Sequence, residues 1–134
     1  WAVEGGQAYV NRQQIQVSKP REMNQHATIL APSATLKGFS VKYQGRALCL
    51  GSAAAHICYV ARGKIHGGII ESVRLYDIAA STIIMKEAGG VVQYLSGQNV
   101  DLWQLIQGQK VPEPFVFGHL ENVKQLQQLF QYEK

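Results

Sequence analysis

Residues 75–90 read LYDIAASTIIMKEAGG, an apolar stretch with an aspartate near its start. Apolar side chains recur there at helical spacing, and a glycine pair ends the pattern. We therefore predict a helix from about Asp77 to Ala88, followed by a strand at 91–95. Asp77 is explained most simply as the N-cap of this helix, because its carboxylate can accept bonds from backbone N–H groups and is favoured by the helix dipole.

Strands and helices alternate on both sides of this helix. A short strand in 27–34 should end at Pro32, and extended segments in 39–50 are broken at Gly45. The other predicted elements are a strand, turn and strand in 1–18, a helix capped by Ser52 and ended by Gly63, buried strands at 67–71 and 114–118, a surface loop at 107–114, and a final amphipathic helix from Leu120 to Phe130. This alternation predicts an α/β fold with a mixed, largely parallel sheet flanked by helices.

Length and composition predict one domain, residues 1–134, because 134 residues with 46% hydrophobic content can build a real core. No apolar run is long enough to span a membrane, and the start lacks the layout of a signal peptide. We therefore expect a soluble, cytoplasmic protein without membrane contacts. The chain has no initiator methionine and opens inside a predicted strand meander, so we expect that further sequence once preceded Trp1.

The net charge of +4 does not indicate nucleic-acid binding, because the basic residues are spread over several segments without runs or aromatic interleaving. A solvated basic surface and a site for small anionic substrates both remain open. Cys49 and Cys58 are predicted to be small buried hydrophobic residues rather than zinc ligands or a disulfide. Helical spacing places four glutamines on a solvated face: Gln125, Gln127, Gln128 and Gln131.

Four motifs occur in order along the chain: EGGQAYVNRQQIQVS (4–18), GSAAAHICYVARG (51–63), LYDIAA (75–80) and EAGGVVQYLSGQ (87–98). Their succession resembles the inositol monophosphatase-like family of magnesium-dependent phosphatases, in which an aromatic-Asp-x-Ala-Ala stretch leads to Glu-Ala-Gly-Gly. Tyr76 stands where that family usually has tryptophan. The likeness covers nearly the whole chain and implies the fold of the C-terminal domain of inositol monophosphatase and fructose-1,6-bisphosphatase-like enzymes.

The resemblance also implies a site for a small phosphorylated substrate. It makes Asp77 a Mg²⁺ ligand, and it gives Gly51, Ser52 and Ala53 contacts to the substrate, which free N–H groups at a helix start can make. Clustered Mg²⁺ ions would neutralise the phosphoryl oxygens and activate a water molecule. No catalytic residue is assigned within this chain.

The other metal ligands of that family come from a Gly-Glu-Glu-like motif and an Asp-Pro-Ile/Leu-Asp-Gly-Thr motif, and neither occurs in these residues. We therefore expect the chain to be the C-terminal half of a two-domain phosphatase whose N-terminal, metal-binding half is its missing partner. On that interpretation Mg²⁺ belongs only to the complete enzyme, and the chain is inactive alone.

An acidic residue that contacts substrate in the inositol-phosphate enzymes precedes the aspartate motif. The matching position holds Ile70, and Glu71 follows one place late, so Glu71 could reach a substrate only if the loop 71–75 is remodelled. Arg74 could bind an anionic ligand or pair with Glu71. Lys86 and Glu87 are predicted to be an exposed helix end. The histidines His56, His66 and His119 share no metal-ligand spacing, which favours packing or surface roles.

Two functions of different classes remain open. One is half of a magnesium-dependent phosphomonoesterase acting on an inositol or sugar phosphate. The other is a non-catalytic domain, either a degenerate fragment or a protein-interaction module with an exposed sheet edge, and either form could be a homo-oligomer.

Overall fold

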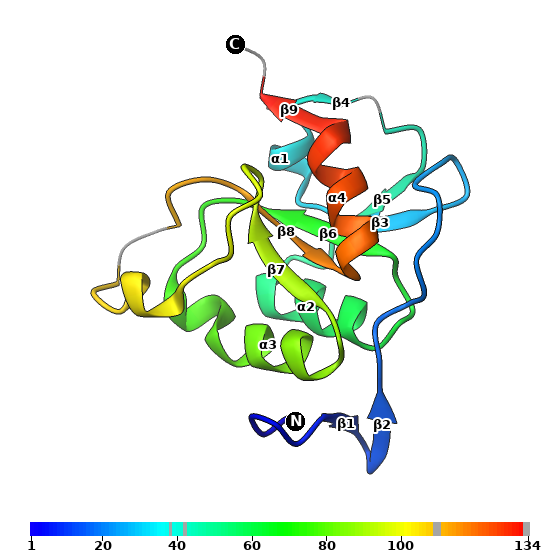
Figure 1. The fold of residues 1–134 in the computed structure, drawn as a ribbon. Helices are drawn as coiled ribbons and strands as arrows, with labels where there is room; N and C mark the ends of the chain where they lie inside the picture. The colour runs from blue at the N-terminus through cyan, green and yellow to red at the C-terminus, as the bar shows by residue number, and fades with distance from the viewer. Residues whose placement is uncertain (38, 42, 109–110, 133–134) are drawn as a thin grey trace.

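The computed structural model describes residues 1–37, 39–41, 43–108 and 111–132. Figure 1 shows a central sheet with helices on both faces and a small N-terminal hairpin beside them. Its strands are β1 (Ala8–Val10), β2 (Gln13–Ile15), β3 (Thr28–Leu30), β4 (Phe39–Val41), β5 (Arg46–Leu48), β6 (Gly67–Ile70), β7 (Val91–Tyr94), β8 (Phe115–Gly118) and β9 (Phe130–Tyr132). Its helices are α1 (Ser33–Lys37), α2 (Ala53–Ala61), α3 (Leu75–Glu87), α4 (Leu120–Leu129) and the 3₁₀ turn η1 (Leu102–Leu105).

The five-stranded sheet has the order β5-β3-β6-β8-β7. Strand β3 runs parallel to β5 and to β6, whereas β8 runs antiparallel to β6 and to β7. Strand β8 is therefore the member of this sheet that opposes the direction of the others. The predicted α/β class with a mixed, largely parallel sheet is confirmed.

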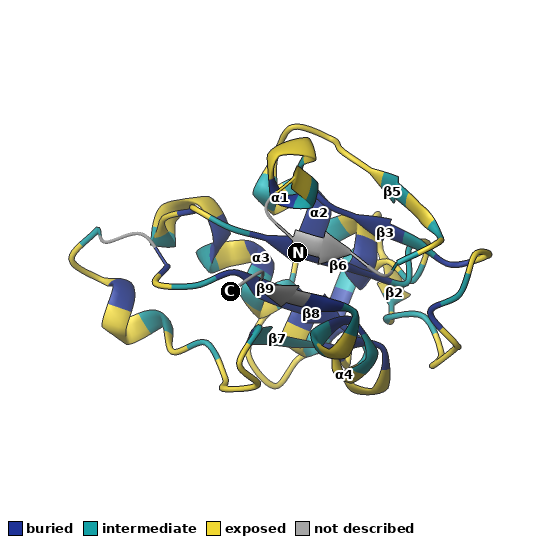
Figure 2. Ribbon diagram, turned by 90° about the horizontal axis from the view of Figure 1, so that it is seen from above, coloured by how far each residue is buried: buried dark blue, intermediate teal, exposed yellow. Residues whose placement is uncertain are grey.

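Alternating side chains of the central strands build a separate core on each face of the sheet. Leu30 and Ile70 point into the core beneath α2 and α3, together with Phe117 of β8. Their neighbours Ile29 and Ile69 point to the opposite core, where α4 packs. Figure 2 shows the central strands mainly dark blue and the outer turns of the helices yellow, as this layered arrangement requires.

Short elements account for most of the differences from the predicted secondary structure. The pattern of the sequence did not predict α1, η1 or β9, which are each too short to show a hydrophobic period. Pro32 ends β3 as predicted, but its carbonyl also accepts a 3.3 Å bond from Leu36 N–H at the start of α1. The predicted loop at 107–114 includes residues 109–110, which lie outside the described residues.

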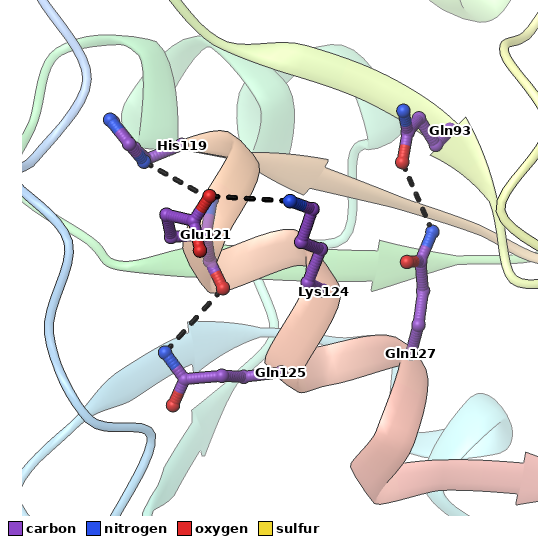
Figure 3. Close-up of polar contacts among 6 residues, drawn as sticks. All are labelled: Gln93, His119, Glu121, Lys124, Gln125 and Gln127. Atoms are coloured by element: carbon purple, nitrogen blue, oxygen red, sulfur yellow. Dashed lines mark hydrogen bonds and ion pairs between the residues drawn. The ribbon is translucent and has the colours of Figure 1, made fainter.

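Helix α4 is fixed by its polar side chains as well as by its apolar face (Figure 3). His119 caps it, since its Nδ1 accepts a 3.2 Å bond from Glu121 N–H. Gln127 donates to Gln93 Oε1 at 3.2 Å, and Gln125 donates to the Arg21 carbonyl at 2.8 Å. The solvated-face prediction is therefore wrong for Gln125 and Gln127, because both side chains satisfy polar groups of neighbouring segments.

The remaining glutamines and the cysteines give a mixed result. Gln128 is exposed as predicted, and the side chain of Gln131 lies outside the described residues. Both cysteines are free thiols, which agrees with the prediction that they form no disulfide. Cys58 is half-buried, but Cys49 is exposed, because it follows the edge strand β5.

Among the described residues, no helix is both long and apolar enough to cross a lipid bilayer.

Gly68 provides a test of the close packing within the sheet. A methyl group there would lie 2.4 Å from the Phe117 ring and 2.8 Å from the Leu30 carbonyl oxygen. We expect Gly68→Ala to lower the free energy of unfolding by about 1–3 kcal/mol, because a packed core tolerates extra volume poorly. Chemical denaturation followed by circular dichroism measures this change.

Gly6→Ala is the matched control, since its added methyl would meet only Val3, at 3.2 Å from the carbonyl oxygen, in an exposed turn that can shift by a few tenths of an ångström. It should change the free energy of unfolding by no more than about 0.5 kcal/mol. Equal stability of Gly68→Ala and wild type would contradict the packing described for β6.

Candidate functional site

The candidate site lies at one edge of the sheet, where two parallel strands lead into helices. Strand β5 is followed by α2, and β6 by α3. Because β5 and β6 run in the same direction, both helices begin beside the carboxyl ends of the strands. The two helices pack against each other, and both run from left to right in Figure 1. This edge therefore collects the start of α2 and the start of α3.

The turn before α2 is open to solvent. Gly51 has φ +73°, its surface is exposed, and no atom lies within 4 Å of the position of an added methyl. Ser52 is the N-cap, as predicted, because its Oγ accepts a 3.3 Å bond from Ala55 N–H. The N–H of Ala53 has no partner inside the helix, as is general for a first helical residue. Hydroxyl and N–H groups here can therefore bind an oxygen-rich ligand.

A buried histidine supports this turn from within α2. His56 is 1% exposed, and its Nε2 accepts a 2.8 Å bond from Leu50 N–H. Its Nδ1 has no hydrogen-bond partner among the described residues. Burial lowers the pKa of His56 from its ordinary value of 6.5. The predicted packing role of His56 is confirmed, but its contact with Leu50 was missed, because no sequence pattern indicates which backbone group a lone histidine will meet.

Asp77 is the third residue of α3 and not its N-cap, because the helix begins at Leu75. Asp77 Oδ2 accepts a 3.0 Å bond from Arg74 N–H, while Asp77 N–H donates to the Arg74 carbonyl at 3.0 Å. The carboxylate thus caps the helix by reaching back from its first turn. The helix starts at Leu75, two residues earlier than predicted, and its N-cap is Arg74 instead of Asp77, although the capping chemistry of the Asp77 carboxylate was right. Asp77 Oδ1 has no partner among the described residues, and the residue is exposed.

Glu71 lies directly beyond β6 and is half-buried. Ile70 before it is 1% exposed and belongs to the core beneath α2 and α3. Ser72 has φ +58°, so the chain turns sharply there and does not continue the strand. The chain therefore leaves the strand direction immediately after Glu71, and contact of Glu71 with a substrate stays a prediction. The ion pairs of the described residues are Lys86–Glu4 and Lys124–Glu121, so Arg74 does not pair with Glu71.

The far end of α3 holds the N-terminal segment. Glu87 accepts bonds from Gly5 N–H at 2.9 Å and from Gln7 N–H at 3.2 Å, and Lys86 lies 3.4 Å from Glu4. The prediction of a simple exposed helix end is therefore wrong for Glu87, which is half-buried. The Glu87 carboxylate satisfies the backbone N–H groups of Gly5 and Gln7, which lie in a turn outside the strands.

The described residues do not by themselves fit a Mg²⁺ centre. No group of three or more His, Cys, Asp or Glu side chains comes close enough together there to hold a metal ion. Mg²⁺ requires near-octahedral oxygen coordination and usually takes one or two carboxylates together with water and substrate oxygens. Asp77 could supply one such carboxylate oxygen, and the rest of the coordination would have to come from other groups.

The fold, the glycine-serine turn and the aspartate at the head of α3 define an α/β domain with a candidate binding site at the carboxyl ends of its parallel strands. Residues 1–115 match the model of the inositol monophosphatase family. The chain therefore belongs to the inositol monophosphatase family, as the sequence motifs predicted.

Individual relatives agree with this assignment. The chain is 32% identical over 127 residues to a protein of Aquifex aeolicus named fructose-1,6-bisphosphatase/inositol-1-monophosphatase, covering 87% of this chain and 47% of that protein. It is 43% identical over 70 residues to a bifunctional NADP phosphatase/NAD kinase of Methanococcus maripaludis, covering 51% and 12% of the two chains. The solved structure of Thermotoga maritima IMPase superposes with a TM-score of 0.77 at 26% identity, covering 96% of this chain and 49% of that one. The chain thus spans about half or less of each relative's length.

Acid should destabilise the fold through its histidines. Burial lowers the pKa of His56, and burial together with the nearby Arg21 guanidinium lowers the pKa of His66. The unfolded chain therefore binds more protons than the folded chain as the pH falls below about 6.5. The neutral forms of His56 and His66 therefore contribute their full stabilisation above about pH 6.5, and this stabilisation is lost as the pH falls through the pKa values of the folded state.

We expect His56→Gln to reduce the dependence of the unfolding free energy on pH between about 7.5 and 5.5. Exposed His26→Gln is the control and should leave the dependence as in wild type. Urea titrations at several pH values measure both variants. An unchanged dependence in His56→Gln would show that His56 accepts its proton readily in the folded state.

The role of Asp77 in the helix cap can be separated from metal binding by thermal melts with and without Mg²⁺. We expect Asp77→Ala to destabilise the 134-residue chain by about 0.5–2 kcal/mol, and Asp77→Asn by less, since the amide oxygen can still accept the Arg74 N–H bond. Mg²⁺ should not raise the melting temperature of any of the three proteins. Stabilisation of wild type by Mg²⁺ that disappears in Asp77→Asn would reveal further ligands within this chain.

Proposed function

We propose that this chain is the C-terminal domain of a cytoplasmic, Mg²⁺-dependent phosphomonoesterase that hydrolyses an inositol or sugar phosphate. Residues 1–134 form that single domain, and the chain is inactive alone. The observation that carries the proposal is the arrangement at the sheet edge: Asp77 keeps one carboxylate oxygen without a partner among the described residues, and α2 begins at the same edge with an open, polar turn.

The proposal assigns separate roles to these residues. Asp77 is a metal ligand, with Oδ2 held by Arg74 N–H and Oδ1 left for the ion. Gly51, Ser52 and Ala53 form part of the substrate wall, where the Ser52 hydroxyl and the N–H groups at the start of α2 bind substrate oxygens. Glu71 contributes from the loop after β6. When bound, Mg²⁺ would neutralise charge on the phosphoryl oxygens and lower the pKa of a bound water.

The described residues supply too few carboxylates for a Mg²⁺ site, so the proposed enzyme needs metal ligands from elsewhere. Asp77 and Glu71 do not lie in any three-membered group of potential ligands among the described residues. We propose that an N-terminal domain, outside these 134 residues, supplies the remaining carboxylates. The names of relatives support the substrate class, since the Aquifex aeolicus protein is named for both fructose bisphosphate and inositol monophosphate.

A non-catalytic interaction domain is the second candidate, and one surface favours it. A groove of about 520 Å³ runs between α3, Glu4 and the η1 segment. On its rim Trp103 is 79% exposed and Ile106 is 58% exposed. Exposed apolar side chains beside a groove are typical of surfaces that bind other proteins, including a second copy of the same chain.

Phosphatase assays separate the two candidates. In the protein expressed from its whole reading frame, we expect Mg²⁺-dependent hydrolysis of inositol and sugar phosphates. Asp77→Asn should lower kcat by about 100-fold or more, because a metal ligand acts on the transition state. Glu121→Gln is the control, since that exposed carboxylate pairs with Lys124 on α4. The 134-residue chain alone should show no saturable turnover.

Two results would contradict the proposal. One is full activity of Asp77→Asn in the protein from the whole reading frame. The other is a wild-type protein from that reading frame without Mg²⁺-dependent turnover, which would favour the interaction domain.

A further inference from the structure

A single residue, His56, contacts both ends of the turn that leads into α2. Its backbone N–H donates to the Ser52 carbonyl at 3.0 Å, and its imidazole Nε2 accepts the Leu50 N–H at 2.8 Å. Gly51 lies between these two contacts. His56 therefore fixes the backbone immediately before and immediately after Gly51.

The turn has few other supports. Gly51 and Ser52 are exposed, and Gly51 offers no side chain that could pack against the protein. The Ser52 Oγ bond to Ala55 N–H fixes the start of the helix but does not reach Leu50. The orientation of the peptide groups around Gly51 thus depends on the Leu50–His56 bond, because glycine itself allows many backbone conformations.

We infer that His56 is a positioning residue, whose neutral imidazole holds the Gly51–Ser52–Ala53 turn in the geometry that binds the phosphorylated substrate. The identity of the substrate in this inference rests on the proposed function. The inference also requires the His56 ring to be neutral, because Nε2 must be unprotonated to accept the Leu50 N–H bond. The proton of the neutral ring then resides on Nδ1, which is buried and has no partner in the part of the chain that the structure describes.

Protonation of His56 would place a donor on each ring nitrogen, so Nε2 would face the Leu50 N–H donor with a hydrogen of its own. The hydrogen bond would then be lost and the turn released. The chemistry of the contact thus links the position of the turn to the charge of His56.

The groups around His56 do not oppose a neutral imidazole. Helix α2 packs against α3, β6 and β8, and the two strands carry no titratable side chain. The charged groups of α3 have other partners: Asp77 accepts from Arg74 N–H, Lys86 pairs with Glu4, and Glu87 binds the N-terminal segment. Tyr76 of α3, Cys58 and Tyr59 of α2, and the nearby Cys49 and Arg62 complete the titratable set on these elements. The pKa of His56 is lowered by burial and not by the charge of any of these groups.

Amide hydrogen exchange of the 134-residue chain tests the positioning role directly. At pH 7.5 the Leu50 amide should be protected in wild type, and His56→Leu should reduce that protection about tenfold. His56→Gln should restore most of it, because its side-chain oxygen can accept the same bond. Tyr59→Phe, on the exposed side of α2, is the control and should exchange as wild type. Protection of Leu50 in wild type should also decline as His56 is protonated, with Val60 as the internal reference.

Kinetics of the protein from the whole reading frame test the link to the substrate. His56→Leu should raise KM about fivefold with little change in kcat, and His56→Gln should reverse the effect, because the turn contributes binding and not chemistry. Equal Leu50 exchange in wild type and His56→Leu, or an unchanged KM in His56→Leu, would overturn the inference. Absence of phosphatase activity in the wild-type protein would instead count against the proposed function, and the exchange data would still decide whether His56 positions the turn.

Discussion

The absence of side chains at the start of β6 is the constraint on which the rest of the domain depends. A methyl group on Gly67 would lie 2.8 Å from Leu126 of α4, and one on Gly68 would lie 2.4 Å from the Phe117 ring on the other face. Both layers therefore approach the middle strand at a distance that only glycine permits. Because β6 is central in the sheet order, this close approach sets the spacing of α4 on one face and of the Phe117 core on the other.

The site follows from the direction of the strands on either side of that contact. Strands β5, β3 and β6 are parallel, so the connections to α2 and α3 leave from the same edge of the sheet. The helices then pack side by side beneath the Phe117 core, with their free N–H groups at that edge. An open turn and an exposed carboxylate are brought to one edge without a long loop, because each lies within a few residues of the end of a strand of this sheet.

The sequence predicted the large elements well, because their signals are local. The helix over residues 53–61 had a serine cap and a terminal glycine, and the strands at 67–70 and 115–118 were short buried runs bounded by polar residues. The start of α3 was missed by two residues, because Asp at the third helical position and Asp at the cap satisfy the same kind of backbone donor.

Contacts between distant segments were beyond the reach of sequence patterns. Glu87, Gln125 and Gln127 all looked like solvated helix residues, yet each binds backbone or side-chain groups from another segment. Residues 51–53 and Asp77 were recognised as site residues only through their motifs. The turn at Ser72, directly after Glu71, depends on a left-handed backbone conformation that serine rarely adopts, so no sequence pattern indicated it.

Helix α3 joins two attachments that lie at its opposite ends. Its 13 residues span about 20 Å, with Asp77 in the first turn and Glu87 at the last residue. Glu87 grips the backbone of the 4–7 turn, which leads into the β1–β2 hairpin. Helix α3 therefore joins the N-terminal segment at its last residue to the Asp77 carboxylate in its first turn. The N-terminal segment and the end of the sheet that carries Asp77 are thus connected through one continuous helix.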